Sequence, residues 1–271
     1  MLALRIASLR HLRHKSVKLS EIWERALFLL SVPKCICCGE LLDFEEKALC
    51  SSCSEIFNEQ KSRNCSRCSR KIPYCTCSNF YLESHYVKKL IKVYRYNSSK
   101  PELPGNLLVY CLKHDNRRDA FIRASVELAH SIEAAIDLSE NKEYFIITNV
   151  PRRHKAILEN GYDHAEMIAR RIAKILGIEY AQFLVSKTEK PQKEVYGEKR
   201  KENAKFDYKK GPERSLKGKT VIIVDDVVTT GSSLAACAAL IRGMGTRKII
   251  GAALSIAYKD SYLKPRPSYS R

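Results

Sequence analysis

The sequence lacks any long run of apolar residues. Its longest stretches, at 26–32 and 249–257, fall well short of the roughly 18–20 residues that a membrane-spanning helix needs. It also lacks an N-terminal leader with an apolar core of about 7–15 residues and a small-residue cleavage site. No serine–histidine–aspartate triad is suggested. We therefore expect a cytoplasmic chain, and we exclude an integral membrane protein and a secreted disulfide scaffold.

Acidic residues are scarce beside basic ones. The 271 residues include 30 Asp and Glu against 48 Lys and Arg, a formal net charge of +18. Folding does not require this excess, which points to an anionic partner such as nucleic acid, phosphate or anionic lipid. The first twenty residues contain no acid at all. This basic tail is typical of a membrane-surface helix or a transit segment, and equally of a frayed terminus.

Short apolar runs alternate with helical patterns in the C-terminal part of the chain. The runs lie at 107–113, 144–150, 220–227 and 248–257, and the helical patterns at 118–138, 161–176 and 232–243. Strands of continuous apolar residues between helices are typical of a parallel sheet covered on both faces. We predict a doubly wound α/β domain at 107–260.

Smaller segments flank this domain. We predict a basic tail at 1–20, a helix at 21–34, a cysteine-rich module at 35–80, a connecting segment at 81–106 and a short tail at 261–271. The connecting region contains Tyr81, Tyr86, Tyr94 and Tyr96. These rings suit either stacking on nucleic-acid bases or packing between domains.

Nine of the eleven cysteines lie in the cysteine-rich module. Cys35 and Cys38 form one C-x-x-C pair, and Cys50 and Cys53 form a second. Two such pairs bring four thiolates to one ion, and a closed tetrahedron of sulfur is the usual structural zinc site. The pattern predicts a zinc site here, with Cys37 as a spare thiol.

A second group of four cysteines follows in the same module. Cys65 and Cys68 again have C-x-x-C spacing, whereas Cys75 and Cys77 are separated by one residue. The group predicts a second zinc ion. Two alternatives remain open: one ion that draws ligands from both groups, or an iron–sulfur cluster.

The segment at 186–219 is polar and rich in lysine. It interrupts the α/β pattern, and such a long insertion in a compact domain is usually functional or mobile. We expect either a lid, with Lys193 and Arg200 approaching a bound pyrophosphate, or a solvated charged loop.

The sequence at 221–233 predicts a buried strand that runs into two acids and then into a small-residue turn that opens a helix. In an open α/β sheet, ligands bind outside the carboxyl ends of the strands, where this turn must lie. Its N–H groups, its hydroxyls and the helix N-terminus suit a phosphate dianion. Asp225 and Asp226 suit vicinal hydroxyls, or Mg²⁺ held directly or through water. The sequence thus predicts a ribose 5-phosphate ligand.

These residues resemble the phosphoribosyl pyrophosphate (PRPP) motif of type I phosphoribosyltransferases. The resemblance implies that Asp225 and Asp226, the candidate catalytic residues, meet the ribose hydroxyls, and that 229–233 hold the 5-phosphate. The predicted PRPP-binding residues are Asp225, Asp226, Val227, Val228, Thr229, Thr230, Gly231, Ser232, Ser233, Pro151, Arg152, Arg153, Lys193 and Arg200.

A cysteine-rich ribbon ahead of such a domain is similar to the ComF family of bacterial competence proteins. Further segments agree with it: Val150-Pro151 with the block at 160–165, the block from Thr188 to Phe206, and Leu112-Lys113. Asn160 stands where the family has arginine. The resemblance implies a double zinc ribbon at 35–80 and a type I phosphoribosyltransferase sheet. It also implies single-stranded DNA and a competence helicase as partners, at the inner face of the cytoplasmic membrane.

Two functions from different classes follow. One is a protein that binds PRPP and single-stranded DNA during DNA uptake. The alternative is an active, Mg²⁺-dependent phosphoribosyltransferase that transfers phosphoribose to a base or amine and releases pyrophosphate. The resemblance favours the first, and the PRPP-type motif is compatible with both.

Overall fold

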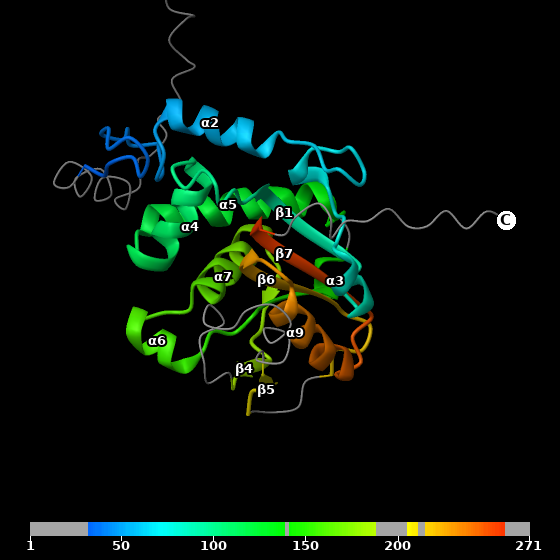
Figure 1. Ribbon diagram of the computed structural model, residues 1–271. Coiled ribbons are helices and arrows are strands. Elements are labelled where there is room, and N and C mark those ends of the chain that lie inside the picture. Colours follow the sequence, from blue (N-terminus) through cyan, green and yellow to red (C-terminus); the bar gives the residue numbers. More distant parts are fainter. Residues whose placement is uncertain (1–31, 139–140, 188–204, 211–214, 258–271) are drawn as a thin grey trace, which may run out of the picture.

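A computed structural model describes residues 32–138, 141–187, 205–210 and 215–257 (Figure 1). The helices are α2 (Ser51–Lys61), α3 (Phe80–Ser84), α4 (Pro104–His114), α5 (Arg118–Ala135), α6 (His154–Asn160), α7 (His164–Leu176) and α9 (Ser232–Gly243), with short 3-10 turns η1 (Ile72–Tyr74) and η2 (Lys142–Tyr144). The strands are β1 (Lys89–Arg95), β2 (Phe145–Asn149), β3 (Glu179–Tyr180), β4 (Leu184–Ser186), β5 (Phe206–Tyr208), β6 (Thr220–Val228) and β7 (Lys248–Ile256).

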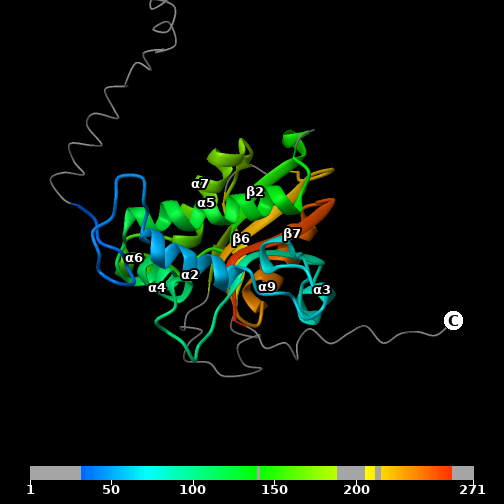
Figure 2. The same ribbon diagram turned by 90° about the horizontal axis from the view of Figure 1, so that it is seen from above.

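Five strands form one parallel sheet in the order β1-β7-β6-β2-β3. Helices α5 and α7 cover one face, and α9 covers the other with α3 beside it (Figures 1 and 2). The predicted doubly wound α/β fold is therefore confirmed. Strand β3, which follows β2 in the chain, pairs with one edge of β2, and the later strand β6 pairs with its other edge. The sheet thus has its topological switch point between β2 and β6, where ligands of such folds bind.

The continuous apolar sequence of β6 explains its central place. Ile222 and Val224 pack under α5 and α7, while Val221 and Ile223 point into the core under α9. All four side chains are fully buried. A strand that is buried on both faces has no polar side, which is why it reads as an uninterrupted apolar run.

The prediction that residues 107–113 form a strand is wrong. This segment lies in helix α4, whose first residue is Pro104. Leu108, Val109 and Leu112 are buried, and their spacing of three and four residues is helical. A short apolar run cannot by itself distinguish a buried helix from a buried strand.

The edge strand of the sheet comes instead from the segment at 81–106, which the sequence predicted to be a connection. Strand β1 pairs with β7 there, and its central residues are buried. Lys92, in the middle of the strand, interrupts its apolar pattern. The predicted helix at 161–176 begins later, at His164, because Gly161 ends α6 with a positive φ of 82° and Asp163 caps α7.

Several predicted segments lie outside the described residues. They are the basic tail, almost all of the helix at 21–34, Lys193, Arg200 and the tail at 261–271. Among the helices that are described, none combines the length and the apolarity needed to cross a membrane.

Candidate functional site

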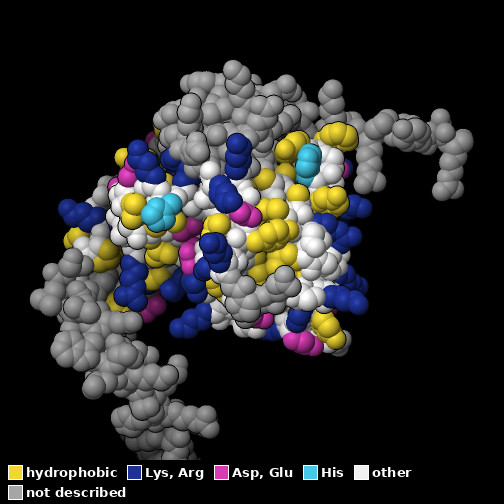
Figure 3. Space-filling view, turned by 90° about the horizontal axis from the view of Figure 1, so that it is seen from below, with side chains coloured by type: hydrophobic (Ala, Val, Ile, Leu, Met, Phe, Trp, Pro, Cys, Tyr) yellow, Lys and Arg dark blue, Asp and Glu magenta, His cyan; other side chains and the backbone are white. Residues whose placement is uncertain are grey.

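A pocket of about 380 Å³ opens at the carboxyl ends of β6 and β2. Strand β6 supplies the two acids, and the segment after β2 supplies Pro151, Arg152 and Arg153. Ser186 of β4 and Phe206 of β5 line another part of it. Figure 3 shows the molecule from below, where Lys and Arg side chains gather around a few acidic ones. The pocket lies at the switch point of the sheet, as the topology requires.

The turn between β6 and α9 has a backbone that only glycine adopts easily. Gly231 has a φ of +87° and directly precedes Ser232, the first residue of α9. A side chain at 231 would also collide, because a Cβ atom there would lie 2.7 Å from Cγ of Leu82. The Thr230 and Ser232 hydroxyls lie 3.0 Å apart. The turn therefore presents hydroxyls and the positive end of a helix to the pocket.

Asp225 and Asp226 have opposite pKa shifts. Burial and the neighbouring Asp226 carboxylate raise the pKa of Asp225 well above its ordinary value. Burial would raise the pKa of Asp226 as well, but the Lys113 ammonium outweighs it, and that pKa is lowered. The Lys113 Nζ lies 3.0 Å from Oδ2 of Asp226, and this pairing raises the pKa of the lysine against the effect of its burial.

The opposite wall is organised by Asp163, a buried side chain. Its carboxylate accepts hydrogen bonds from the Arg152 backbone N–H at 2.8 Å and from the Glu166 backbone N–H at 3.2 Å. Asp163 thereby joins the segment after β2 to the start of α7. Its burial raises its pKa.

His164 lines the same wall and contacts the Arg152 guanidinium. Burial first, and then the positive charge of Arg152, lower the pKa of His164 to about 4. The ring is therefore neutral at pH 7 and has one nitrogen free of a proton. Only 2% of His164 is exposed, so the ring is a buried part of the pocket wall.

Most of the predicted PRPP-binding residues meet in this pocket. Its lining includes Pro151, Arg152, Arg153, Asp225, Asp226, Val227, Val228, Thr229, Gly231, Ser232 and Ser233. Thr230 is not in the lining, and its carbonyl oxygen accepts a hydrogen bond from Asn79. Lys193 and Arg200 lie outside the described residues. The role of each residue stays a prediction.

The list of predicted site residues missed four titratable residues of the pocket: Lys113, His114, Asp163 and His164. Lys113 and His114 end helix α4, far from β6 in the sequence. The Leu112-Lys113 segment had carried a signal, because it matches the family pattern. Nothing in the sequence placed that lysine beside Asp226.

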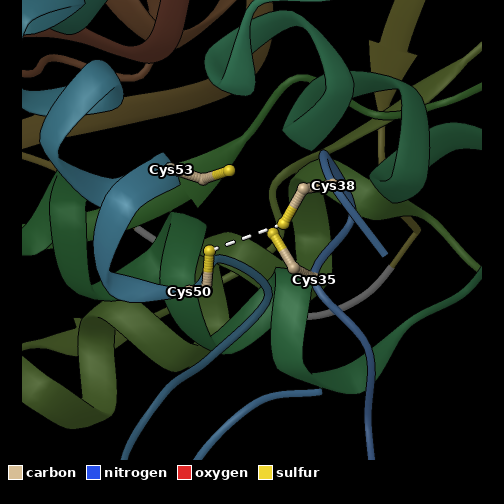
Figure 4. Close-up of side chains that lie close together, drawn as sticks. All are labelled: Cys35, Cys38, Cys50 and Cys53. Carbon is tan, nitrogen blue, oxygen red and sulfur yellow. Dashed lines mark hydrogen bonds between the residues drawn. The ribbon is translucent and has the colours of Figure 1, made fainter. Parts of the chain in front are cut away.

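The first cysteine group forms a compact cluster (Figure 4). The sulfurs of Cys35, Cys38, Cys50 and Cys53 all lie within 4.8 Å of one another, with 3.6 Å between those of Cys38 and Cys50. A zinc–sulfur distance of about 2.3 Å sets sulfurs ~3.8 Å apart in a tetrahedron, so the group fits zinc. Burial tends to raise the pKa of Cys35, but backbone N–H groups near its sulfur outweigh this and lower the pKa to about 7.

The second cysteine group fits in the same way. The sulfurs of Cys65, Cys68, Cys75 and Cys77 also lie within 4.8 Å of one another, with 3.6 Å between Cys68 and Cys75. The two groups are separate, so the arrangement in which one ion draws on both is wrong. Helix α2 lies between them along the top of the molecule in Figure 1.

A family model for the phosphoribosyl transferase domain matches residues 160–271. Among curated proteins, a ribose-phosphate pyrophosphokinase from Thermococcus kodakarensis is 33% identical over 81 residues, which are 30% of this chain and 24% of that protein. The chain thus spans about a quarter of the length of this relative.

Solved structures give distant matches. A purine phosphoribosyltransferase from Pyrococcus horikoshii is 23% identical, with 51% of this chain and 81% of that chain covered and a TM-score of 0.33. A xanthine-guanine-hypoxanthine phosphoribosyltransferase from Helicobacter pylori is 15% identical, with 52% and 88% covered and a TM-score of 0.30. On the evidence of the family match and the cysteine geometry, the chain carries a type I phosphoribosyltransferase domain and two four-cysteine clusters that fit zinc ribbons.

Proposed function

We propose that the pocket binds PRPP, or a related ribose 5-phosphate, together with Mg²⁺. The observation that carries this proposal is the direct succession, in one pocket, of the two carboxylates of β6 and the glycine turn that opens α9. An N-terminal helix end with small hydroxyl residues favours a phosphate dianion. The 5-phosphate then lies against residues 229–233.

The two acids are the groups that would bind the ribose. Carboxylates accept hydrogen bonds from vicinal hydroxyls, and Asp225 and Asp226 stand at the end of β6, just before the turn. The raised pKa of Asp225 reflects first its burial and then the Asp226 carboxylate held close to it. Such a pair favours a nearby divalent cation, which supplies charge neutralisation for the pyrophosphate group when it is bound.

Basic groups on the other wall suit the pyrophosphate. Arg152 and Arg153 line the pocket after β2, and Lys113 approaches it from α4. Fixed cations that face a departing anion lower the barrier by electrostatic stabilisation. If the segment at 186–219 is a lid, Lys193 and Arg200 add to this set.

The reaction class that fits this arrangement is glycosyl transfer. A nitrogen nucleophile forms a bond to C1 of the ribose while the bond from C1 to the pyrophosphate oxygen breaks. The pyrophosphate leaves with the bonding pair, and the nitrogen loses a proton. The residues of the chain contribute by orienting the sugar and by stabilising charge.

The first test replaces both acids. We expect the Asp225→Asn/Asp226→Asn variant to lose Mg²⁺-dependent binding of PRPP by about 100-fold or more, because hydrogen bonds to charged groups contribute about 1.5–3 kcal/mol each. Calorimetric titration with PRPP, with and without Mg²⁺, measures this, and an assay for pyrophosphate in the presence of bases or ammonia reports turnover.

A matched variant, Asp43→Asn/Glu45→Gln, makes the same change of charge at two exposed positions outside the pocket. It should bind PRPP like the unmodified protein. If the unmodified protein binds neither PRPP nor ribose 5-phosphate, the proposal is wrong. Binding without any pyrophosphate release would support the binding protein over the transferase.

Exposed aromatic and basic side chains near the second cysteine cluster favour a second function, the binding of single-stranded DNA. Phe80 is 78% exposed, and Tyr74 and Tyr86 are each 55% exposed. Arg70 and Lys71 are exposed in the same segment. Such rings stack on bases while cations meet the phosphates. Tyr94 does not belong to this set, because it is fully buried and packs against Phe57.

This role, with a helicase partner in DNA uptake at the membrane, is a proposal that the sequence resemblance supports. We expect binding of a single-stranded oligonucleotide to weaken at least about tenfold between 50 and 200 mM salt, because phosphate contacts release counterions. Phe80→Ala should weaken it further, by about 1–3 kcal/mol. Fluorescence anisotropy measures both effects, with the exposed Tyr144→Ala as control. An affinity for the oligonucleotide that changes neither with salt nor in Phe80→Ala would contradict this function.

A further inference from the structure

A buried lysine of the sheet contacts the second cysteine cluster. Lys92, in the middle of β1, is only 1% exposed. Its Nζ donates to the Cys75 sulfur at 3.2 Å and to the Cys77 carbonyl oxygen at 2.6 Å. A lysine is almost never buried without a negative partner. Four thiolates around Zn²⁺ carry a net charge of about −2, so Lys92 is placed as the counter-cation of this cluster.

The same cluster is tied to helix α3. Arg67, which lies between two of the cysteines, donates to the Ser78 carbonyl oxygen at 3.0 Å and pairs with Glu83 of α3. Asn79 caps the helix, because its side-chain oxygen accepts from the Leu82 backbone N–H at 2.8 Å. The position of α3 therefore depends on the fold of the cluster.

Helix α3 in turn contacts the turn proposed to hold phosphate. The Asn79 side-chain amide donates to the Thr230 carbonyl oxygen at 3.2 Å. Leu82, which is fully buried, fills the space beside Gly231, where a Cβ atom would lie 2.7 Å from its Cγ. One backbone carbonyl and one glycine of the turn are thus fixed by residues that follow the last cysteine of the cluster.

We infer that the second metal cluster is a positioning device for the turn at 229–233, with Lys92 as its buried counter-cation and Asn79 and Leu82 as the residues that transmit its order. The inference extends the proposed function and rests on it for the ligand. Coupling between two sites is reciprocal. Loss of metal from the second cluster loosens the turn, and a ligand bound at the turn slows the loss of that metal.

The test uses the zinc-loaded full chain. Hydrogen exchange of the backbone amides at 229–234 is measured in the unmodified protein, in Asn79→Ala and in Lys92→Met. We expect exchange in this segment to become at least about threefold faster in both variants. Zinc release to a colorimetric chelator should be faster for one of two ions in Lys92→Met, and less accelerated in Asn79→Ala, which lies beyond the cluster. Lys88→Met, an exposed residue just before β1, is the matched control and should change neither quantity.

The reciprocal measurement adds PRPP. We expect saturating PRPP with Mg²⁺ to slow the release of one zinc ion at least about threefold, and Asn79→Ala to abolish this slowing. If exchange at 229–234 is the same in all variants, the inference is wrong, whether or not PRPP binds. If PRPP fails to bind while exchange responds to Lys92 and Asn79, the link between cluster and turn is supported and the proposed ligand is wrong.

Discussion

Removal of zinc is expected to lower the melting temperature of the protein by at least about 10 °C. Structural zinc sites supply about 10–16 kcal/mol of apparent folding free energy in small peptides. Here the cysteines are part of the core, because Cys35 and Cys53 pack with Leu49 and Phe57. We expect the loss of folding free energy to be about half of the peptide value. A loss of about 1 kcal/mol lowers the melting temperature of a domain of this size by 2–4 °C.

Elemental analysis and thermal melts measure this effect. We expect two zinc ions per chain. The Cys53→Ser and Cys75→Ser variants, one in each cluster, should each retain one. Iron in stoichiometric amount, or one zinc in the unmodified protein, would contradict two zinc ribbons.

Cys37 provides a matched control for these variants. It belongs to neither cluster, and burial together with the nearby Cys35 raises the pKa of its thiol to about 12. Because its sulfur lies outside both groups of four, it is not placed to bind either ion. We expect Cys37→Ser to keep both zinc ions, with a change in stability of about 1 kcal/mol or less. Loss of an ion in this variant would show that the ligand assignment is wrong.

The parts of the site that the sequence predicted are encoded in short local segments, at 151–153, at 225–233 and in the cysteine pairs. The two acids, the glycine and the hydroxyl residues around α9 are neighbours in the chain, and so are the cysteines of each pair. Strand β6 was predictable because both of its faces are buried, which forces an unbroken apolar run. In all these cases, local spacing alone carries the geometry.

The parts that were missed depend on tertiary contacts. Lys113 is a site residue only because α4 ends beside β6, and α4 itself was expected as a strand. In the sequence, Lys92 argues against a buried strand. In the fold it is buried because the cysteine cluster beside it supplies a negative partner. In both cases a lysine is held in place by a group that is distant in sequence, and neither propensity nor periodicity contains that information.

Loss of the Lys113 ammonium is expected to weaken the binding of PRPP with Mg²⁺ at least about tenfold. In Lys113→Met the carboxylate of Asp226 loses its partner while it remains partly buried beside Asp225. The pocket also loses a fixed cation that faces the pyrophosphate, and a hydrogen bond to a charged group contributes about 1.5–3 kcal/mol. Lys113→Arg keeps the charge and should recover part of the affinity. Calorimetric titration at pH 7 measures these differences.

The pH dependence of the variant separates a lost charge from a general loss of structure. In the unmodified protein Lys113 lowers the pKa of Asp226. This pairing therefore stabilises the fold above the unfolded pKa of about 3.9, and its contribution is lost as the pH falls through the lower folded value. In Lys113→Met burial and Asp225 raise the pKa of Asp226, so PRPP binding should begin to fail at a higher pH than in the unmodified protein.

Lys61 offers a matched control, because its ion pair with Glu127 at 2.7 Å is similarly shielded but lies on α2, outside the pocket. Lys61→Met should lose less stability in urea unfolding than Lys113→Met, because Glu127 keeps its ion pair with Arg123 at 2.9 Å. Its affinity for PRPP and the pH profile of binding should stay unchanged, because no carboxylate of the pocket loses its partner. If Lys113→Met behaves like Lys61→Met in both measurements, Lys113 acts only on stability, and Asp226 does not need this lysine to meet the sugar.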